Sequence, residues 1–142
     1  MNYLFAIVLL LATQDYTGKS TCAEVVYPTA GDQLPRVRRK VEPEFPAYPK
    51  DVRKVWAKII MEATVDTEGG VADVKTLSCK VGKGEKTLEG EEAQRYCPQF
   101  SINAENAVTQ WLYEPALRGG KAVCVHYTMR VDFVSTTGGP TR

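Results

Sequence analysis

The chain contains 142 residues, of which 44% are hydrophobic and 25% are charged, the size and composition of one globular domain with extensions. Its 18 basic and 17 acidic side chains leave a formal net charge of +1. Because such a balance produces no basic field over the whole molecule, we expect no nucleic-acid partner.

The amino terminus, "MNYLFAIVLLLATQDYTGKSTCA", contains an apolar stretch at residues 3–12. As a helix this stretch would be ~15 Å long, about half of the ~30 Å hydrocarbon core of a bilayer. We interpret residues 1–23 as a probable signal peptide or apolar leader, although the positive charge that normally precedes such a stretch is missing. Cleavage near Gln14 or after Ala23 fits the small residues there. The alternative is a buried amino-terminal strand or helix.

Residues 24–44 contain proline, glycine and charge without a sustained period, which predicts an extended linker ahead of a folded domain at residues 45–134. The basic run "RVRRK" at residues 36–40 is typical of a solvated linker. Its alternative role is contact with anionic lipid or with an acidic partner.

The domain is expected to begin with a short helix whose first turn holds Pro49, where the missing N–H of proline has no cost. The period then changes to two, as in a strand with one buried side. In "WAKIIMEATVD" the apolar positions on that side are Ala57, Ile59, Met61, Ala63 and Val65. The turn "DTEGG" leads into "VADVKTLS", so we predict an antiparallel hairpin.

Four cysteines, which allow three pairings, bear on the compartment. We favour a disulfide between Cys79 and Cys97, because it would tie down the polar excursion at residues 80–96. In the alternative all four are small, inert core residues. No two cysteines have zinc-knuckle spacing and the chain has 1 histidine, so we predict no metal and no cofactor.

A second helix is predicted from "SINAENAVTQWLYEP", with Ser101 as the N-cap and Trp111 on the inner face. Pro115 disfavours helical geometry at Glu114 and so ends this helix. Gly119 and Gly120 then reverse the chain into the clearest strand pattern, residues 123–133. Residues 135–142 are expected to be a disordered tail.

This order of elements predicts an α+β fold. We expect a small two-layer sandwich, in which a three-stranded antiparallel sheet carries two helices on one face.

The sequence resembles the carboxy-terminal domain of the TonB family over residues 45–133. The resemblance lies in a "YP" entry, a glycine-marked hairpin, a helix exit "WLYEPA", a "GGKAV" reversal and a closing "VDF" strand. The residues that carry these motifs are Tyr48, Pro49, Gly70, Trp111, Pro115 and Gly120.

The resemblance implies a binding module and not an enzyme. TonB-type domains lie in the periplasm, at the end of an energy transducer, and bind outer-membrane receptor segments by adding a strand to an exposed sheet edge. By resemblance that edge is the last strand, with the binding residues Val123, Val125, Tyr127, Met129, Arg130, Val131, Asp132 and Phe133. The expected partner is therefore a protein or an extended peptide. A strand-exchanged homodimer is a further possibility.

A full transducer also needs a spanning anchor and a long proline-rich linker, and the sequence shows neither. We therefore expect an exported, stand-alone module that is periplasmic or secreted. The alternative is an abbreviated transducer whose uncut leader holds it in the inner membrane. A third hypothesis is a small enzyme that uses Cys124 and His126. These two residues are better explained as incidental sheet-surface residues, so we predict no catalytic residues.

Overall fold

The computed structural model describes residues 22–135. Apart from residues 22–23 and 135, the predicted leader (residues 1–23) and the predicted tail (residues 135–142) lie outside the described residues. In chain order the elements are β1 (Arg36–Arg39), the 3-10 helix η1 (Val52–Lys54), β2 (Val55–Val65), β3 (Val71–Lys83), β4 (Lys86–Thr87), α1 (Gly90–Val108), β5 (Leu112–Glu114), β6 (Ala116–Arg118), β7 (Lys121–Val123) and β8 (Val125–Phe133).

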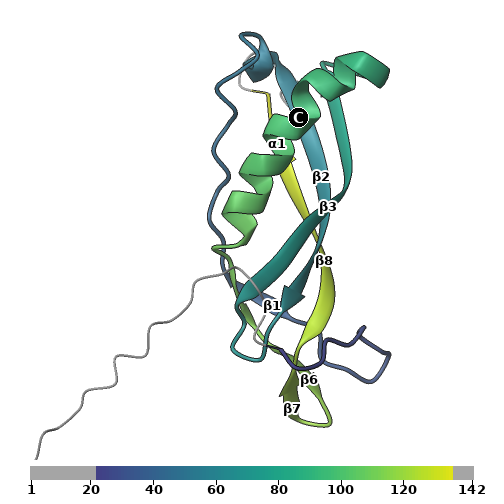
Figure 1. Cartoon of the computed structure of the whole chain (residues 1–142), viewed down its shortest axis with the longest axis vertical. Helices are drawn as coiled ribbons and strands as arrows, with labels where there is room; N and C mark the ends of the chain where they lie inside the picture. The colour runs from purple at the N-terminus through teal and green to yellow at the C-terminus, as the bar shows by residue number, and fades with distance from the viewer. Residues whose placement is uncertain (1–21, 136–142) are drawn as a thin grey trace, which may run out of the picture.

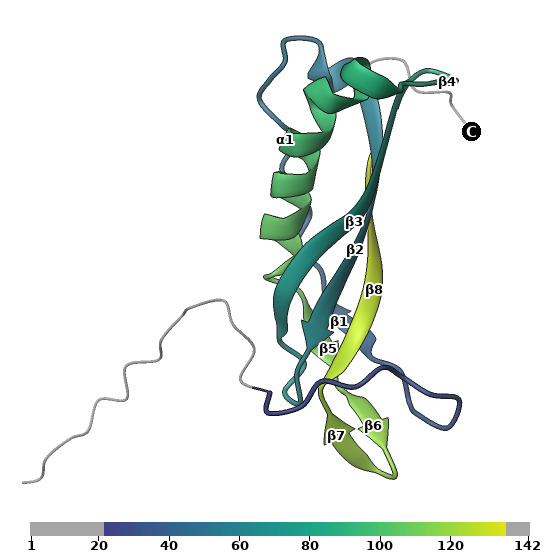
Figure 2. The same cartoon turned by 45° about the vertical axis from the view of Figure 1, so that its right-hand side comes forward.

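The main sheet has the strand order β4-β3-β2-β8, and all of its pairings are antiparallel. The helix α1 lies across one face of this sheet (Figures 1 and 2). Two small sheets, β1-β5 and β6-β7, lie beyond the end of α1. The last strand of the chain therefore forms one margin of the main sheet.

The predicted three-stranded sheet with two helices is wrong. The described residues contain one α-helix and eight strands in three sheets. The expected first helix shrinks to the three residues of η1, and Pro49 precedes it, because Asp51 is its N-cap. Sequence patterns missed the shortest strands, which have two to four residues and show no period.

The predicted hairpin is present as β2 and β3. The inner positions of β2 are at most 2% exposed, which confirms the alternation seen in the sequence. In the turn between the strands, Oδ1 of Asp66 accepts hydrogen bonds from the N–H groups of Glu68 and Gly70, each at 2.9 Å. The backbone of Gly69 has a positive φ of 86°, a conformation that glycine adopts without steric cost.

The helix α1 begins twelve residues before the predicted start, since its N-cap is Glu89 and not Ser101. Its buried side chains recur at helical spacing and pack on the sheet: Tyr96, Phe100, Ala104, Ala107 and Val108. The excursion expected at residues 80–96 is therefore the end of β3, then β4 and the first turns of α1.

The helix also ends earlier than predicted, at Val108, so that Trp111 follows the helix instead of lying on it. Trp111 is 5% exposed, and its Nε1–H donates to the carbonyl of Val41 at 2.9 Å. The residues after Trp111 form β5, which pairs with β1. Trp111 therefore fixes the segment before β2 against the end of the helix.

The expected last strand is interrupted. Val123 belongs to β7 and pairs with Ala116, whereas β8 starts at Val125. Gly119 and Gly120 turn the chain between β6 and β7, and both have positive φ.

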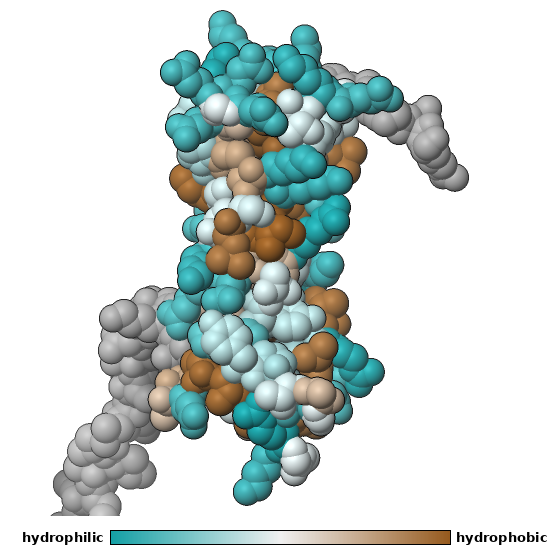
Figure 3. Space-filling view, turned by 90° about the vertical axis from the view of Figure 1, so that its right-hand side faces the viewer, coloured by the Kyte–Doolittle hydropathy of each residue, from teal (hydrophilic) through white to brown (hydrophobic). Residues whose placement is uncertain are grey.

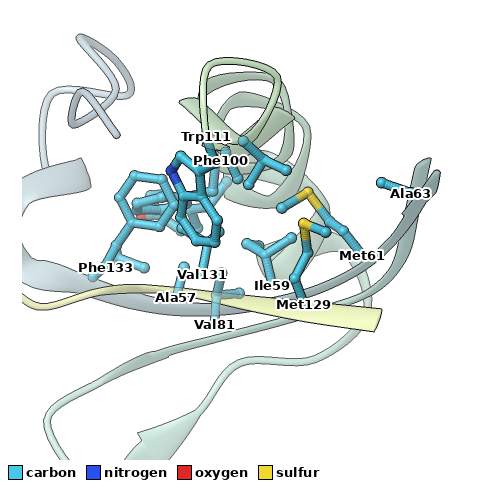
Figure 4. Close-up of a cluster of buried hydrophobic side chains, with 14 of the residues drawn as sticks. Ala57, Ile59, Met61, Ala63, Val81, Phe100, Trp111, Met129, Val131 and Phe133 are labelled. Atoms are coloured by element: carbon cyan, nitrogen blue, oxygen red, sulfur yellow. The ribbon is translucent and has the colours of Figure 1, made fainter. Parts of the chain in front are cut away.

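The core lies between α1 and the inner face of the main sheet (Figure 4). Its aromatic centre is Phe100, whose ring contacts those of Phe133 and Phe45 edge-on, at centroid distances of 4.8 and 5.4 Å. Phe45 belongs to the extended segment before β2. The core thereby joins that segment, the helix and the last residue of β8.

An ion pair connects the N-cap residue of η1 with the end of β3. Oδ2 of Asp51 accepts hydrogen bonds from Nζ of Lys83 at 2.7 Å and from the hydroxyl of Tyr96 at 2.8 Å. These two bonds, that from Lys83 first, lower the pKa of Asp51 from 3.8 to about 2. A carboxyl group whose pKa is lowered by folding stabilises the fold above its ordinary pKa, and that contribution is lost as the pH falls towards the folded value.

We therefore expect Asp51→Asn to lower the free energy of unfolding most near neutral pH. The difference from wild type should shrink as the pH falls from 3.8 towards 2, since the wild-type carboxyl then becomes protonated. Urea unfolding of both proteins over this range measures the difference. An equal difference at both ends of the range would contradict the assignment.

Candidate functional site

The outer margin of β8 is the candidate site, and alternation along the strand decides which backbone groups face it. The N–H of His126 donates outward to the carbonyl of Val26 at 3.0 Å, and the carbonyl of Cys124 accepts from the N–H of Val26 at 3.0 Å. Because N–H and C=O groups point to alternate margins along a strand, those of Thr128, Arg130 and Asp132 also point outward.

These outward groups are unpaired within the described part of the chain. Between Tyr127 and Phe133, β8 pairs with β2 alone, and the pairing uses the other margin. No backbone hydrogen bond between described residues involves the outward N–H or C=O groups of Thr128, Arg130 or Asp132. The margin therefore offers three donors and three acceptors in a row to an incoming strand.

The opposite margin of the sheet is less suited to strand addition. The pairing of β3 with β2 shifts register twice, between Ile60 and Met61 and between Glu62 and Thr64. Asp73, in the second shifted stretch, has a positive φ of 51°. Bulges of this kind twist an edge and break its row of hydrogen-bonding groups. The pairing of β8 with β2 runs without a shift from Val125 to Phe133, so β8 is the regular edge.

Half of the eight side chains predicted to bind a partner are buried in the core. Val125, Met129, Val131 and Phe133 are at most 5% exposed, because they belong to the hydrophobic core. Tyr127 is half-buried, with its ring edge-on to that of Tyr113. These side chains already make their contacts within the molecule. A partner strand can therefore contact only the backbone of β8 and its outer side chains.

Three outer side chains accompany the unpaired backbone groups. Thr128, Arg130 and Asp132 are exposed, and Nε of Arg130 donates to Oδ1 of Asp132 at 2.8 Å. This hydrogen bond raises the pKa of Arg130 above its ordinary value, so the guanidinium adds a fixed positive charge to the site. Thr128 is absent from the predicted binding residues, although the same alternation that selected Arg130 and Asp132 identifies it.

The face of the main sheet opposite α1 lies beside this edge (Figure 2). Ile60 of β2 lies between Ser78 of β3 and Arg130 of β8 on this face. Leu77, which is inserted at the first register shift, is 51% exposed. Figure 3 shows apolar side chains near the middle of the molecule on this side, below a hydrophilic end. A strand added to β8 would place alternate side chains beside this face.

The motif residues lie away from the β8 margin and serve the fold. Tyr48 is 59% exposed, and its hydroxyl accepts a hydrogen bond from Nε2 of Gln99 at 2.8 Å. Gly70 belongs to the β2–β3 turn, and Gly120 to the β6–β7 turn. Pro115 separates β5 from β6.

Two disulfides join the four cysteines. Cys79 and Cys97 form the bond favoured from the sequence, between β3 and α1. Cys22 and Cys124 form the second. Disulfides persist in oxidising compartments, so the pairing indicates an exported protein. No helix within residues 22–135 is long and apolar enough to cross a membrane.

The second disulfide also limits two sequence hypotheses. The sulfur of Cys124 is bonded to Cys22, so the oxidised protein has no Cys124 thiol to act beside His126 as a nucleophile. The His126 ring instead stacks on Tyr27 at a centroid distance of 4.3 Å. Cleavage after Ala23 would remove Cys22 and with it this disulfide.

No protein-family model matches the sequence, and no curated protein matches it.

Proposed function

We propose that this protein is an exported binding module that recognises an extended segment of another protein by strand addition at the outer margin of β8. The unpaired N–H and C=O groups of Thr128, Arg130 and Asp132 carry the proposal, because an incoming strand can complete all of them. The unshifted pairing of β8 with β2 supports it, since it keeps these groups in one line.

The same geometry suggests the chemistry of the partner. The outward groups span five residues, 128–132, so a strand of about five to seven residues covers them. The inner side chains of β8 are buried before a partner arrives, so recognition depends mainly on backbone hydrogen bonds. A partner strand with an acidic residue near Arg130 and a basic residue near Asp132 would pair best in the one register that brings these opposite charges together.

The motif resemblance to TonB carboxy-terminal domains supplies a specific version of this proposal. In that version the domain acts in the periplasm, and its partner is a segment of an outer-membrane receptor. The resemblance rests on "YP", "WLYEPA", "GGKAV" and "VDF" in this order, and the proposed β8 edge is the strand that ends in "VDF".

A pair of proline substitutions tests the proposal. Arg130→Pro removes an outward N–H and leaves the bonds to β2 intact, since proline is tolerated at an edge whose N–H faces solvent. We expect this variant to stay folded and to bind a seven-residue peptide of alternating threonine and valine at least about tenfold more weakly than wild type. Isothermal titration calorimetry measures the affinity, and circular dichroism checks the fold.

Two controls separate the backbone from other effects. Arg130→Ala removes the same charge but keeps the N–H, so it should bind the peptide nearly as well as wild type. Val131→Pro removes an N–H that faces β2, and should therefore unfold or strongly destabilise the protein. Equal peptide affinity of wild type and folded Arg130→Pro, or no binding by either, would refute strand addition at this margin.

A further inference from the structure

The segment before β1 already occupies part of the β8 margin. Val26 pairs in parallel with Val125 and makes two backbone hydrogen bonds along this margin, with Cys124 just before β8 and with His126 in it, each at 3.0 Å. These bonds use the same row of outward groups that continues to Thr128 and beyond. The chain thus supplies its own short strand at one end of the proposed binding edge.

A proline sets where this internal strand stops. In a parallel ladder the next bond would join the carbonyl of His126 to the N–H of residue 28. Residue 28 is proline, which has no N–H, so the ladder cannot continue. The chain turns away directly afterwards, with the N–H of Asp32 donating to the carbonyl of Thr29 at 3.0 Å.

Several contacts hold the internal strand, which we define as residues 22–28. Besides the two backbone bonds of Val26, the ring of Tyr27 stacks on that of His126 at a centroid distance of 4.3 Å, and the Tyr27 carbonyl accepts a hydrogen bond from Nη2 of Arg118 at 3.1 Å. At the start of the internal strand is the disulfide between Cys22 and Cys124. Just after its end, Asp32 accepts hydrogen bonds from Nε and Nη2 of Arg118 at 2.9 and 2.7 Å. A covalent tether next to β8 gives the internal strand a high effective concentration at its two hydrogen bonds. A separate peptide therefore competes poorly for those groups while the disulfide is intact.

The tethering disulfide is open to chemical attack. It forms part of the wall of a surface hollow of about 340 Å³, whose lining includes Cys22, Glu24, Thr67 and Val123. Cys22 is partly exposed, whereas Cys124 is 8% exposed. Because Cys22 is the more exposed of the two residues, we take it as the side from which an incoming thiolate approaches.

We propose that the Cys22–Cys124 disulfide is a thiol-controlled tether that sets the length of the β8 binding edge. A dithiol reductant attacks the Cys22 sulfur, the S–S bond breaks, and Cys124 leaves as a thiolate that takes up a proton. The second thiol of the reductant then resolves the mixed disulfide and releases Cys22. In total two electrons and two protons pass to the protein, and the reductant becomes a disulfide. The internal strand then leaves β8, and the free edge extends from Thr128 back to Cys124.

This inference rests on the proposed function. Its first claim, that the disulfide holds the internal strand on β8, can be tested by amide hydrogen exchange without any peptide. The double variant Cys22→Ser/Cys124→Ser removes the tether, and Cys79→Ser/Cys97→Ser is the matched control that keeps it. We expect the His126 amide to exchange about tenfold faster in the first variant than in wild type, and at the wild-type rate in the control. Titration of the Cys79→Ser/Cys97→Ser variant with a small dithiol gives a second measurement, in which Cys22–Cys124 is the disulfide that reacts. Unchanged His126 exchange after loss of the tether overturns the inference.

The second claim, that loss of the tether lengthens the binding edge, is tested with peptides of two lengths. The probes are synthetic peptides of alternating threonine and valine, one of seven and one of eleven residues. The untethered variant should bind the longer peptide about tenfold more tightly than wild type does, since two more backbone hydrogen bonds form, and should bind the shorter one equally well. An equal gain for both peptides overturns the inference. If neither peptide binds either protein, the proposed function fails, whereas the exchange result still decides whether the tether holds the internal strand.

Discussion

Gly69→Ala is expected to destabilise the fold by about 3 kcal/mol or more. Gly69 has a φ of 86°, which is unfavourable for alanine, and its carbonyl accepts a hydrogen bond from the N–H of Tyr113 at 2.9 Å. A Cβ atom built there would lie well within contact distance of the Tyr113 carbonyl oxygen, which is rigid backbone. The methyl group would therefore push the β2–β3 turn away from β5 as well as strain the turn.

A second glycine separates these two causes. Gly120 has a φ of 78°, but nothing lies within 4 Å of a Cβ atom built there. Gly120→Ala should therefore cost only the backbone strain, about 1–2 kcal/mol. Urea unfolding of wild type and both variants measures the free energies. Equal losses for the two variants would mean that the close approach of Gly69 to Tyr113 contributes nothing to stability.

The strongest periodic signals in the sequence identified the hairpin and the course of the last strand. In β2 every second residue from Ala57 to Val65 is buried, because one face of the sheet carries the core and the other faces solvent. The alternation continues through β8, from Val125 to Phe133. Period-two patterns of this length need no tertiary information, which is why these elements could be predicted.

The helix was misplaced at both ends for local reasons. Its first turn, which includes Glu91 and Glu92, is exposed and carries no apolar period, so the sequence there looked like a loop. At the other end Trp111 follows Val108 at helical spacing, although the chain has already left the helix. The burial of Trp111 comes instead from the segment around Val41, which accepts its Nε1–H. Such a contact across 70 residues has no local signature.

The strand that forms the candidate site was predicted, but the internal strand that pairs with it was not. Alternation placed Arg130 and Asp132 on the outer side of β8, where the structure has them. The internal strand could not be foreseen, since Val26 pairs with β8 from 99 positions earlier in the chain, the difference between 125 and 26. The cysteines offered the available clue, because a bond between Cys79 and Cys97 leaves Cys22 to pair with Cys124.

Phe100→Ala is expected to lower the free energy of unfolding by about 3–5 kcal/mol. Phe100 is fully buried, and its ring packs edge-on against Phe45 and Phe133. Loss of the ring leaves a cavity where the helix, the segment before β2 and the end of β8 meet, so stability is lost by both transfer and cavity formation.

Ile102→Ala on the same helix is the matched control for Phe100→Ala. Ile102 is 50% exposed, so its truncation should change stability by no more than about 0.5 kcal/mol. Urea unfolding measures both variants, and amide exchange at Phe133, whose N–H faces β2, reports on the nearby end of β8. Because Phe133 is held by Phe100, the Phe100→Ala variant should also loosen the pairing of Phe133 with Ala57. If the two variants lose equal stability, Phe100 is not the centre that holds β8 against the helix.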